Sequence, residues 1–150
     1  MDYCNSLLYG VTGKLLSKLQ KVQNTAARII TRTSKYSHIT PILKDLHWLP
    51  VECRLKYKLL LHTHRALYGK APQYITNMVK RYIPGRSLRS QNTTQLEVPK
   101  GRTASYGDRC YTRAAPLLWN TLPSQLQNTN KLSSFKSLLK TYLFQQYYHI

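Results

Sequence analysis

The stretch from His47 to Gly69, HWLPVECRLKYKLLLHTHRALYG, places apolar residues on two opposite sides of one predicted helix. Successive helical residues are about 100° apart, so the positions that share a face can be read from the sequence. One apolar arc holds Val51, Leu55, Leu59, His62 and Ala66, and the other holds Cys53, Tyr57, Leu60, Leu61, Leu67 and Tyr68. Because each apolar face needs a neighbour, we expect this helix to be central in the fold.

Polar residues fill the gaps between these arcs and mark the ends of the helix. A cationic ridge is formed by Arg54, Lys58 and Arg65. Glu52 and Lys56 have the i,i+4 spacing of a helical ion pair. Pro50 suits the first turn, where its missing N–H leaves no donor unpaired, and Gly69 suits the position just after the end. We therefore expect a helix that shows its cationic ridge to solvent.

Two further helices are predicted before this segment. Residues 14–32 give the clearest amphipathic pattern in the chain. Their apolar arc holds Leu15, Leu19, Val22, Ala26, Ile29 and Ile30, while Lys14, Lys21, Arg28 and Arg32 lie on another side. Thr40 and Pro41 are residue types typical of a helix cap and first turn, so a short helix is expected over residues 41–46.

Three helices are predicted in the second half of the chain. The first covers residues 72–83. The second resumes at Ser105, which has the spacing of a capping box with Asp108, and Pro116 is expected to break or kink it. The third is capped by Ser133. Its apolar face holds Phe135, Leu138, Leu139, Tyr142 and Leu143.

Between residues 84 and 104 the chain is polar and basic, and only Leu96 and Val98 alternate as in a strand. We expect an irregular basic loop there, with room for a short β-hairpin. Trp48 and Trp119 are expected to be core anchors, because Leu and Pro flank them. A chain of 150 residues, 42% of them hydrophobic, favours a single domain over residues 1–150. The predicted fold class is mainly α, a small bundle of about five or six helices.

The charge balance is the strongest indication of a partner. The chain has 23 Lys and Arg but only five Asp and Glu, which gives a net charge of +18. A lone domain with this excess repels itself, whereas a polyanion is attracted at long range and bound through counterion release. We therefore expect a nucleic-acid partner, which can be RNA, DNA or an RNA–DNA hybrid. No membrane partner is expected, because the cations are spread along the chain rather than set opposite one apolar face.

The cysteines and the hydropathy pattern limit the cellular setting. Cys4, Cys53 and Cys110 are far apart and form no CxxC pair, which disfavours a disulfide scaffold or a zinc finger. No stretch has the length and apolarity of a membrane span, and the chain does not open with the pattern of a signal peptide. We expect the nucleus or the cytoplasm.

The side chains that support catalysis are scattered. Polymerases and nucleases that use two metal ions need converging carboxylates. The acids are Asp2, Asp45, Glu52, Glu97 and Asp108, with no adjacent or i,i+2 pair. On a helix, His62 and His64 point about 200° apart and cannot share one ion. Cys110 lies near a predicted helix start, where a thiolate can be stabilised, but a small core residue is the simpler interpretation. We expect no metal, no cofactor, no catalytic residue and no enzymatic activity in this chain by itself.

Cations alternate with tyrosines between residues 80 and 113. Arginine forks match phosphate oxygens, and tyrosine rings such as those of Tyr82, Tyr106 and Tyr111 offer stacking surfaces for unpaired bases. The alternative is a basic loop that is merely solvated. With the cations of the two long helices included, the predicted nucleic-acid-binding residues are Arg28, Arg32, Arg54, Lys58, Arg65, Lys80, Arg81, Arg86, Arg89, Lys100, Arg102, Arg109 and Arg113.

Seven phrases occur in the order DYCNSLLYG, KLQKVQNTAARIIT, HITPILKDLHWLPVECRLKYK, YGKAPQYI, RSLRS, YGDRCYTRAAPLLWNTLP and SSFKSLLKTYLF. In this order they resemble the region that follows the reverse transcriptase core in non-LTR (LINE-type) retrotransposons of the chicken-repeat and jockey kind. The resemblance covers essentially the whole chain. None of the phrases is a biochemical motif by itself. The resemblance is specific because all seven phrases occur in register along the chain.

The resemblance implies a fragment of a larger polymerase. In such elements an endonuclease and a catalytic palm with an aromatic-Ala-Asp-Asp motif lie upstream, and the downstream helices form a thumb-like extension that grips nucleic acid. No catalytic motif of the family falls in this stretch, so a nucleic-acid-binding module without catalysis is expected. One alternative is a remnant that completes the missing polymerase core in trans. Another is a non-functional truncated product, which would expose apolar surface and aggregate.

Overall fold

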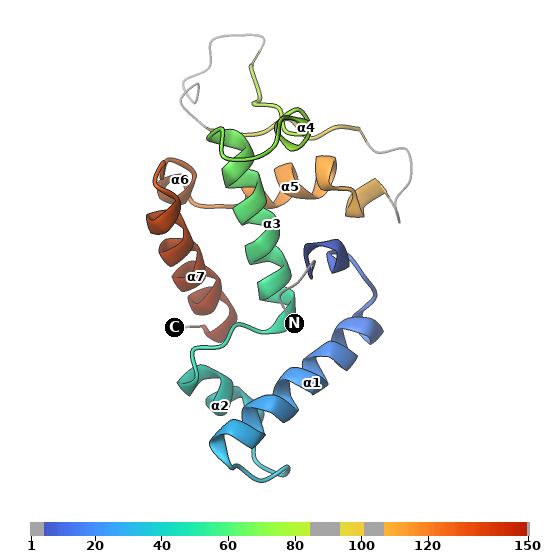
Figure 1. Cartoon of the computed structure of the whole chain (residues 1–150), viewed down its shortest axis with the longest axis vertical. Coiled ribbons are helices and arrows are strands. Elements are labelled where there is room, and N and C mark those ends of the chain that lie inside the picture. The colour runs from blue at the N-terminus through green and yellow to red at the C-terminus, as the bar shows by residue number, and fades with distance from the viewer. Residues whose placement is uncertain (1–4, 85–93, 101–106, 150) are drawn as a thin grey trace. The chain divides into compact units, whose positions relative to one another are not determined.

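The computed structural model describes residues 5–84, 94–100 and 107–149 (Figure 1). In these ranges the chain is mainly helical, as the sequence predicts, with seven α-helices, two 3₁₀-helices and no strand. The helices are η1 (Asn5–Leu8), α1 (Gly13–Thr31), α2 (Ile39–Asp45), α3 (Val51–Leu67), α4 (Gln73–Thr76), η2 (Gly107–Arg109), α5 (Tyr111–Asn120), α6 (Ser124–Gln127) and α7 (Leu132–Tyr148). Within this described part of the chain, none of the helices is both long and apolar enough to cross a bilayer.

Contacts within the chain divide it into two compact units. Unit 1 consists of Met1–Tyr57 together with Lys140–Ile150, and unit 2 consists of Lys58–Leu139. Helices α3 and α7 each contribute residues to both units. The single domain expected over residues 1–150 stays a prediction.

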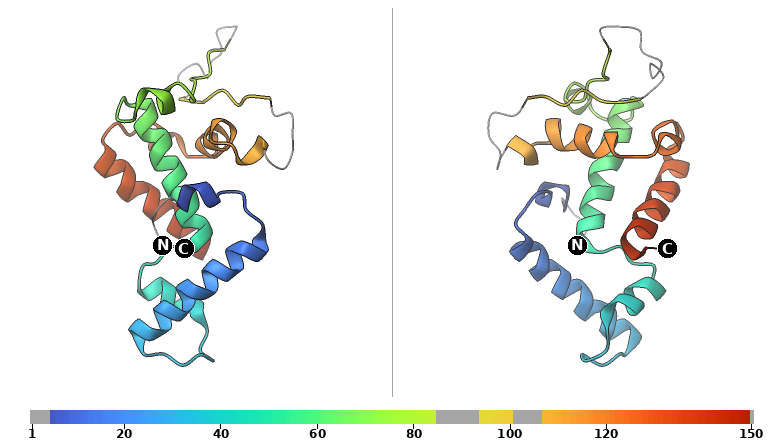
Figure 2. Two further views of the ribbon diagram at one scale, coloured as in Figure 1. Left: turned by 45° about the vertical axis from the view of Figure 1, so that its right-hand side comes forward. Right: turned by 180° about the vertical axis from the view of Figure 1, so that it is seen from behind.

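The core of unit 1 forms where α1 packs on α2, and Figures 1 and 2 show the two helices side by side. Its buried residues are Ala27, Ile42 and Leu43, with Ile39, Leu46, Trp48 and Tyr148 packed around them. The Tyr148 hydroxyl donates a hydrogen bond of 3.0 Å to the Trp48 carbonyl. Burial raises the pKa of Tyr148 to about 12, so this donor keeps its proton at neutral pH. Trp48 supports the core as predicted, although its side chain stays half-buried.

Two glutamines of α1 hold the chain where α3 begins. Val51 is the first residue of α3, and its N–H has no acceptor inside that helix. Gln20 Oε1 accepts a hydrogen bond of 2.9 Å from this N–H. The buried Gln23 donates through Nε2 to the Leu49 carbonyl at 2.8 Å. Gln20 therefore caps α3 with a side chain that lies far away in the sequence.

The amphipathic pattern of residues 14–32 predicts α1 correctly but does not predict which side it buries. The buried residues of α1 are Gln23 and Ala27. Four residues of the apolar arc are mostly exposed: Leu15 at 51%, Val22 at 56%, Ile29 at 71% and Ile30 at 60%. Because the contacts of α1 with α2 and with residues 49–51 use the neighbouring side of the helix, much of the apolar arc stays in solvent.

Helix α3 has the ends, the ion pair and the two buried faces that the sequence predicts. The Arg54 N–H donates to the Pro50 carbonyl at 3.0 Å, and Gly69 adopts a left-handed φ of 66° just after the helix. Lys56 Nζ lies 2.7 Å from Glu52 Oε1. The buried residues from both arcs are Val51, Cys53, Leu55, Leu59, Leu60, Leu61 and Ala66.

The core of unit 2 is an aromatic cluster around the fully buried His64. Ring centroids lie 4.2 Å apart between His64 and Phe135, 4.5 Å between His64 and Tyr68, and 5.8 Å between Trp119 and Phe135. His64 Nε2 lies 2.7 Å from the Thr129 carbonyl oxygen, so this nitrogen carries the proton. The sequence correctly predicts Trp119 as a core anchor, since it is 1% exposed.

The predicted helix over residues 72–83 was mostly wrong, because only α4 forms and it ends at Thr76. Farther along, residues 80–82 are extended and pair with residues 95–97. That pairing takes backbone groups that a longer helix would have used.

The predicted capping box of α5 is not formed by Asp108, which lies in η2 and pairs with Arg113. Ser105 lies outside the described residues. Cys110 instead precedes α5 as its N-cap. Of the predicted break or kink at Pro116, the break was wrong, because α5 continues through this buried proline. Pro116 lies close to the start of the helix, so its missing N–H removes one hydrogen bond, that to the Thr112 carbonyl.

Two other helices begin earlier than predicted. Helix α2 begins at Ile39, two residues before Pro41. Helix α7 begins at Leu132, so Ser133 lies inside its first turn and is not its cap. In α7 the Phe135 N–H donates to the Lys131 carbonyl at 2.9 Å, which sets the helix start one residue after Lys131.

Candidate nucleic-acid interface

Two extended segments of unit 2, residues 80–82 and 95–97, pair with each other and form the base of a basic surface. Arg81 and Leu96 form an isolated antiparallel bridge, flanked by two backbone hydrogen bonds of 2.9 Å. A short hairpin was expected within residues 84–104. In the described part of that region no strand forms, and Leu96 pairs through one bridge with Arg81. The pairing begins upstream of the predicted loop, at residue 80.

The side chains of these segments alternate between an inner and an outer face. Leu96 is 2% exposed and belongs to the inner face. Lys80, Tyr82 and Glu97 lie on the outer face and are exposed. Arg81 shares a face with Leu96, yet it is also exposed, as expected for a long side chain that keeps its charged end in water. A lysine, an arginine and a tyrosine are therefore accessible at consecutive positions.

Asn120, the last residue of α5, holds the second segment through the backbone of Leu96. The Leu96 N–H donates to Asn120 Oδ1 at 2.8 Å, and Asn120 Nδ2 donates to the Leu96 carbonyl at 2.9 Å. Both backbone groups of the buried residue are thus satisfied by one amide side chain. Figure 2 shows this stretch of the chain running beside α5.

A second set of hydrogen bonds holds residue 94 through the buried Gln127. Trp119 Nε1 donates to the Thr94 carbonyl at 2.9 Å, and the Thr94 hydroxyl donates to Gln127 Oε1 at 3.0 Å. Gln127 Nε2 in turn donates to the carbonyls of Trp119, at 2.8 Å, and Leu122, at 3.1 Å. Because Trp119 and Gln127 are buried and their polar groups are paired, they fix the position of the extended segment.

Arg113 of α5 holds the end of the same segment. Its Nη1 donates to the Pro99 carbonyl at 3.1 Å, and its Nε lies 2.6 Å from Asp108 Oδ1. Arg113 was predicted to bind phosphate, but these two contacts give it a structural role. The second contact also neutralises Asp108. Lys100 and Arg109 are exposed in the neighbouring sequence.

The charge of unit 2 is strongly unbalanced. Its described residues include ten Lys and Arg but only two acids, Glu97 and Asp108. One of these acids already pairs with Arg113. The unit therefore carries a large net positive charge that no internal partner balances.

The predicted binding residues are divided between the two units and the undescribed stretches. Unit 2 contains Lys58, Arg65, Lys80, Arg81, Lys100, Arg109 and Arg113. Unit 1 contains Arg28, Arg32 and Arg54. Outside the described residues lie Arg86, Arg89 and Arg102. The structure brings Lys80 and Arg81 together with Tyr82, and it places Lys100 on the segment paired with them.

Three of the predicted binding cations contribute to the structure of unit 1 or lie partly covered there. Arg28 is half-buried and its Nη2 donates to the Ser37 carbonyl at 3.1 Å. The Arg54 guanidinium lies 6.0 Å from the centre of the Trp48 ring. Arg32 is exposed at the left-handed C-cap of α1, with φ 51°. The ridge of Arg54, Lys58 and Arg65 is half-buried rather than fully solvent-exposed, because packing covers the side-chain stems.

The residues weighed for catalysis or metal binding lie apart. Among the described residues, no three of the types His, Cys, Asp and Glu lie close enough to hold one metal ion. Cys53 is buried, which raises the pKa of its thiol. The interpretation of Cys110 as a core residue was wrong, because it is exposed, and its hydrogen bond with the Thr112 hydroxyl lowers the pKa of its thiol.

The residues that support the basic surface had no signal in the sequence. Asn120 and Thr94 act through partners at least 24 positions away, Gln127 acts through partners five to 33 positions away, and their spacing matches no motif. Comparison with known proteins does not assign the chain: no family model matches it, and no curated protein or solved structure is significantly similar to it.

Proposed function

We propose that this protein binds nucleic acid through the surface of unit 2 built on residues 80–82 and 95–100. The proposal rests on the exposed run of Lys80, Arg81 and Tyr82. This run pairs with residues 95–97, and Asn120 and Gln127 hold that segment in place. Lysine and arginine neutralise phosphates, and a tyrosine ring stacks on an unpaired base. A merely solvated basic loop would not need a buried amide network beneath it.

The charge of the whole chain favours the same partner. At +18 the chain attracts a polyanion from a distance, and bound phosphates release the counterions that surround them. The single exposed tyrosine in the run favours segments with accessible bases, so we propose a preference for single-stranded over duplex nucleic acid.

The test is a fluorescence-anisotropy titration of the full chain against single-stranded RNA, single-stranded DNA, duplex DNA and an RNA–DNA hybrid. If about six phosphates are neutralised, the logarithm of the duplex binding constant falls against the logarithm of salt with a slope of about −5. The double variant K80Q/R81Q should bind about tenfold more weakly and reduce this slope by about two. A flat salt response would refute the proposal.

The matched control changes the same amount of charge in unit 1. K35Q/K44Q removes two exposed lysines and lowers the net charge equally. If binding is localised as proposed, this variant loses clearly less affinity than K80Q/R81Q. Equal losses in the two variants would mean that binding follows net charge alone and would overturn the proposed surface.

The resemblance described above supports a narrower proposal, that the chain is a thumb-like module of a LINE-type reverse transcriptase without its catalytic palm. The support is the seven phrases in register over essentially the whole chain. Mixing the protein with an element polymerase that lacks its tail, followed by a primer-extension assay, tests this proposal. A module that only binds should not restore synthesis, whereas a remnant that acts in trans should.

A further inference from the structure

The exposed apolar surface of α1 forms a continuous stripe with a charged border. The stripe consists of Leu15, Val22, Ile29 and Ile30, each more than half exposed. Lys14, Lys18 and Lys21 recur at i, i+4 and i+7 along one edge of it and are exposed. Helix α1 contains no acidic residue. An apolar stripe of this length beside a row of cations is typical of an interaction surface.

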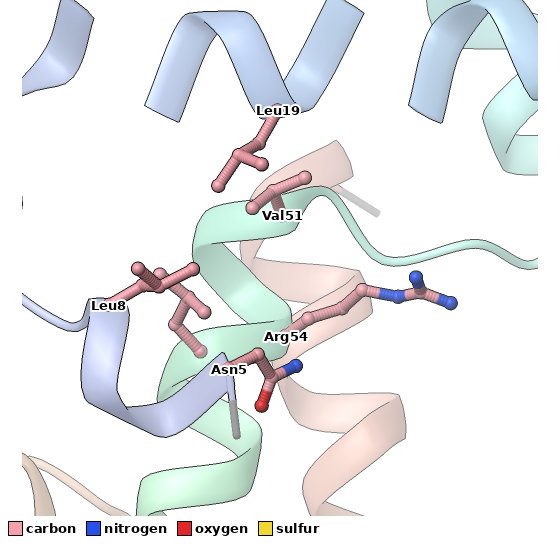
Figure 3. A pocket seen from close by; sticks show the side chains of 6 residues that line it. Asn5, Leu8, Leu19, Val51 and Arg54 are labelled. Carbon is pink, nitrogen blue, oxygen red and sulfur yellow. The ribbon is translucent and has the colours of Figure 1, made fainter. Parts of the chain in front are cut away.

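A cavity of about 90 Å³ adjoins the stripe on its other side. Its lining includes Leu8, Leu19, Val51 and Leu55, together with Asn5 and Arg54. Figure 3 shows Leu8 and Leu19 directed toward a common space near Val51, while the Arg54 side chain extends away from it. Leu19 belongs to the apolar arc of α1, so the cavity continues the stripe. Its volume is suited to about one aliphatic side chain.

We infer that the α1 stripe binds an amphipathic helix of another protein, one that carries acidic residues along one edge. The apolar face of that helix would cover the stripe, and one of its aliphatic side chains would enter the cavity beside Leu19. Its acidic edge would face Lys14, Lys18 and Lys21. Charge complementarity selects this partner, because an acidic edge meets three cations and no opposing acid on α1.

Two other occupants fit the observations less well. A second copy of the chain would bring the same lysines and the same excess charge to the contact, so the two copies would repel each other. A helix that lies on an anionic membrane sets its cations across its polar face, opposite its apolar face. On α1 the cations border only one edge, while the other leads to the cavity and to the buried Gln23.

The test uses the full chain and a fluorescent amphipathic peptide of about 18 residues with leucines at helical spacing and glutamates along one edge. A scrambled peptide of the same composition controls for nonspecific attraction to a basic protein. At near-physiological salt we expect the amphipathic peptide to bind at least about tenfold more tightly than the scrambled one. Equal binding of the two peptides would overturn the inference.

Three pairs of variants locate the binding surface. V22S/I29S should weaken peptide binding by about tenfold or more, whereas L117S/L138S, which changes two exposed leucines of unit 2, should not. K18Q/K21Q should weaken binding of the acidic peptide but not of a neutral peptide with the same apolar face. L8W should block the cavity and weaken binding, whereas L7W changes a neighbouring residue outside the lining and should bind normally.

The remaining outcomes separate this inference from the proposed function and from the two other occupants. V22S/I29S should keep its helical circular dichroism and its affinity for RNA. Unchanged peptide affinity in that variant would refute the stripe as the binding surface. Stripe-dependent binding to vesicles of anionic phospholipid without peptide binding, or stripe-dependent dimers in sedimentation, would also overturn the inference.

Discussion

Asn120, at the end of α5, completes the backbone hydrogen bonding of Leu96. Its Oδ1 accepts a bond of 2.8 Å from the Leu96 N–H, and its Nδ2 donates one of 2.9 Å to the Leu96 carbonyl. The two residues are 24 positions apart. This contact fixes the segment that pairs with Lys80, Arg81 and Tyr82, so a half-buried amide determines where an exposed basic run lies.

Replacing Asn120 by alanine should leave both backbone groups of the buried Leu96 without partners. We expect N120A to lower the free energy of unfolding by about 2 kcal/mol, since unpaired buried polar groups keep their desolvation cost. Denaturant unfolding followed by circular dichroism measures this change. Asn128 is exposed, and N128A should stay within about 0.5 kcal/mol of the wild type. Equal stability of N120A and the wild type would show that the Leu96 contact is not needed for the fold.

His64 should make the stability of the protein depend on pH. Burial lowers the pKa of His64 below its ordinary value of 6.5, because a charged imidazole is poorly solvated in the aromatic core. The unfolded chain therefore binds a proton more readily than the folded chain as the pH falls below 6.5. The stability that neutral His64 contributes is present above that pH and is lost progressively below it.

The measurement is the free energy of unfolding between pH 7.5 and 4.5. His62 has a lowered pKa as well, through partial burial and then through Arg65 and Lys58, so it adds a second contribution with the same sign. We expect H64Q to reduce the pH dependence and H38Q, which changes an exposed histidine, to leave it unchanged. A pH dependence in H64Q as steep as in the wild type would contradict the assignment to His64.

Gln20 caps α3 from another helix, and this contact can be tested by two substitutions. Q20A removes the acceptor for the Val51 N–H and should destabilise the protein by about 1 kcal/mol. Q20E keeps an acceptor oxygen at a helix start, where negative charge is favourable, and should retain most of the stability. Thermal unfolding measures both variants. If Q20E loses as much stability as Q20A, the hydrogen bond is not the reason for the effect.

Tyr82 should contribute to single-strand binding through its ring. We expect Y82A to bind single-stranded RNA about fivefold or more weakly, because stacking contributes about 1–3 kcal/mol per base, and Y82F to bind like the wild type. Duplex binding should change less, since paired bases offer no free face. Tyr36 of unit 1 is 86% exposed, so Y36A is the matched control in anisotropy titrations. An equal loss in Y36A would argue against a specific role for Tyr82.

Glu97 lies across from Lys80 in the paired segments and should weaken phosphate binding by repulsion. Replacing it with glutamine removes the charge and keeps the shape, so E97Q should bind nucleic acid about two- to fivefold more tightly at low salt. The gain should shrink at higher salt. D45N removes an exposed acid of unit 1 and should give a smaller gain. No difference between E97Q and D45N would place the bound phosphates away from Glu97.

Much of the helical fold can be predicted from local pattern. Residues 14–32 and the segment after Pro50 have the spacing of helices, and α1 and α3 lie there. The ion pair of Glu52 with Lys56 forms because the two residues are one helical turn apart. The prediction of a helix over residues 72–83 was wrong for a nonlocal reason. Residues 80–82 pair with residues 95–97, and local spacing cannot show that pairing.

The candidate site could be predicted only in part. Lys80, Arg81 and Tyr82 stand out as a run of cations and an aromatic residue, and the exposure of all three fits the proposed role. Arg28 and Arg113 look equally suitable in the sequence, yet hydrogen bonds to the carbonyls of Ser37 and Pro99 give them structural roles. The sequence does not distinguish an arginine that binds phosphate from one that bonds to the protein backbone. Only the contacts in the folded structure make that distinction.

The sequence by itself determined α1 and α3, the two apolar faces of α3 and the excess of positive charge. These properties depend on composition and on residues within about one turn of each other. The tertiary structure alone decided that α1 buries Gln23 and Ala27 and exposes most of its apolar arc, and that Asn120 and Gln127 hold the basic segment. Those outcomes depend on which polar groups come together when the chain folds. A buried polar group needs a hydrogen-bond partner, and that partner can lie far away in the sequence.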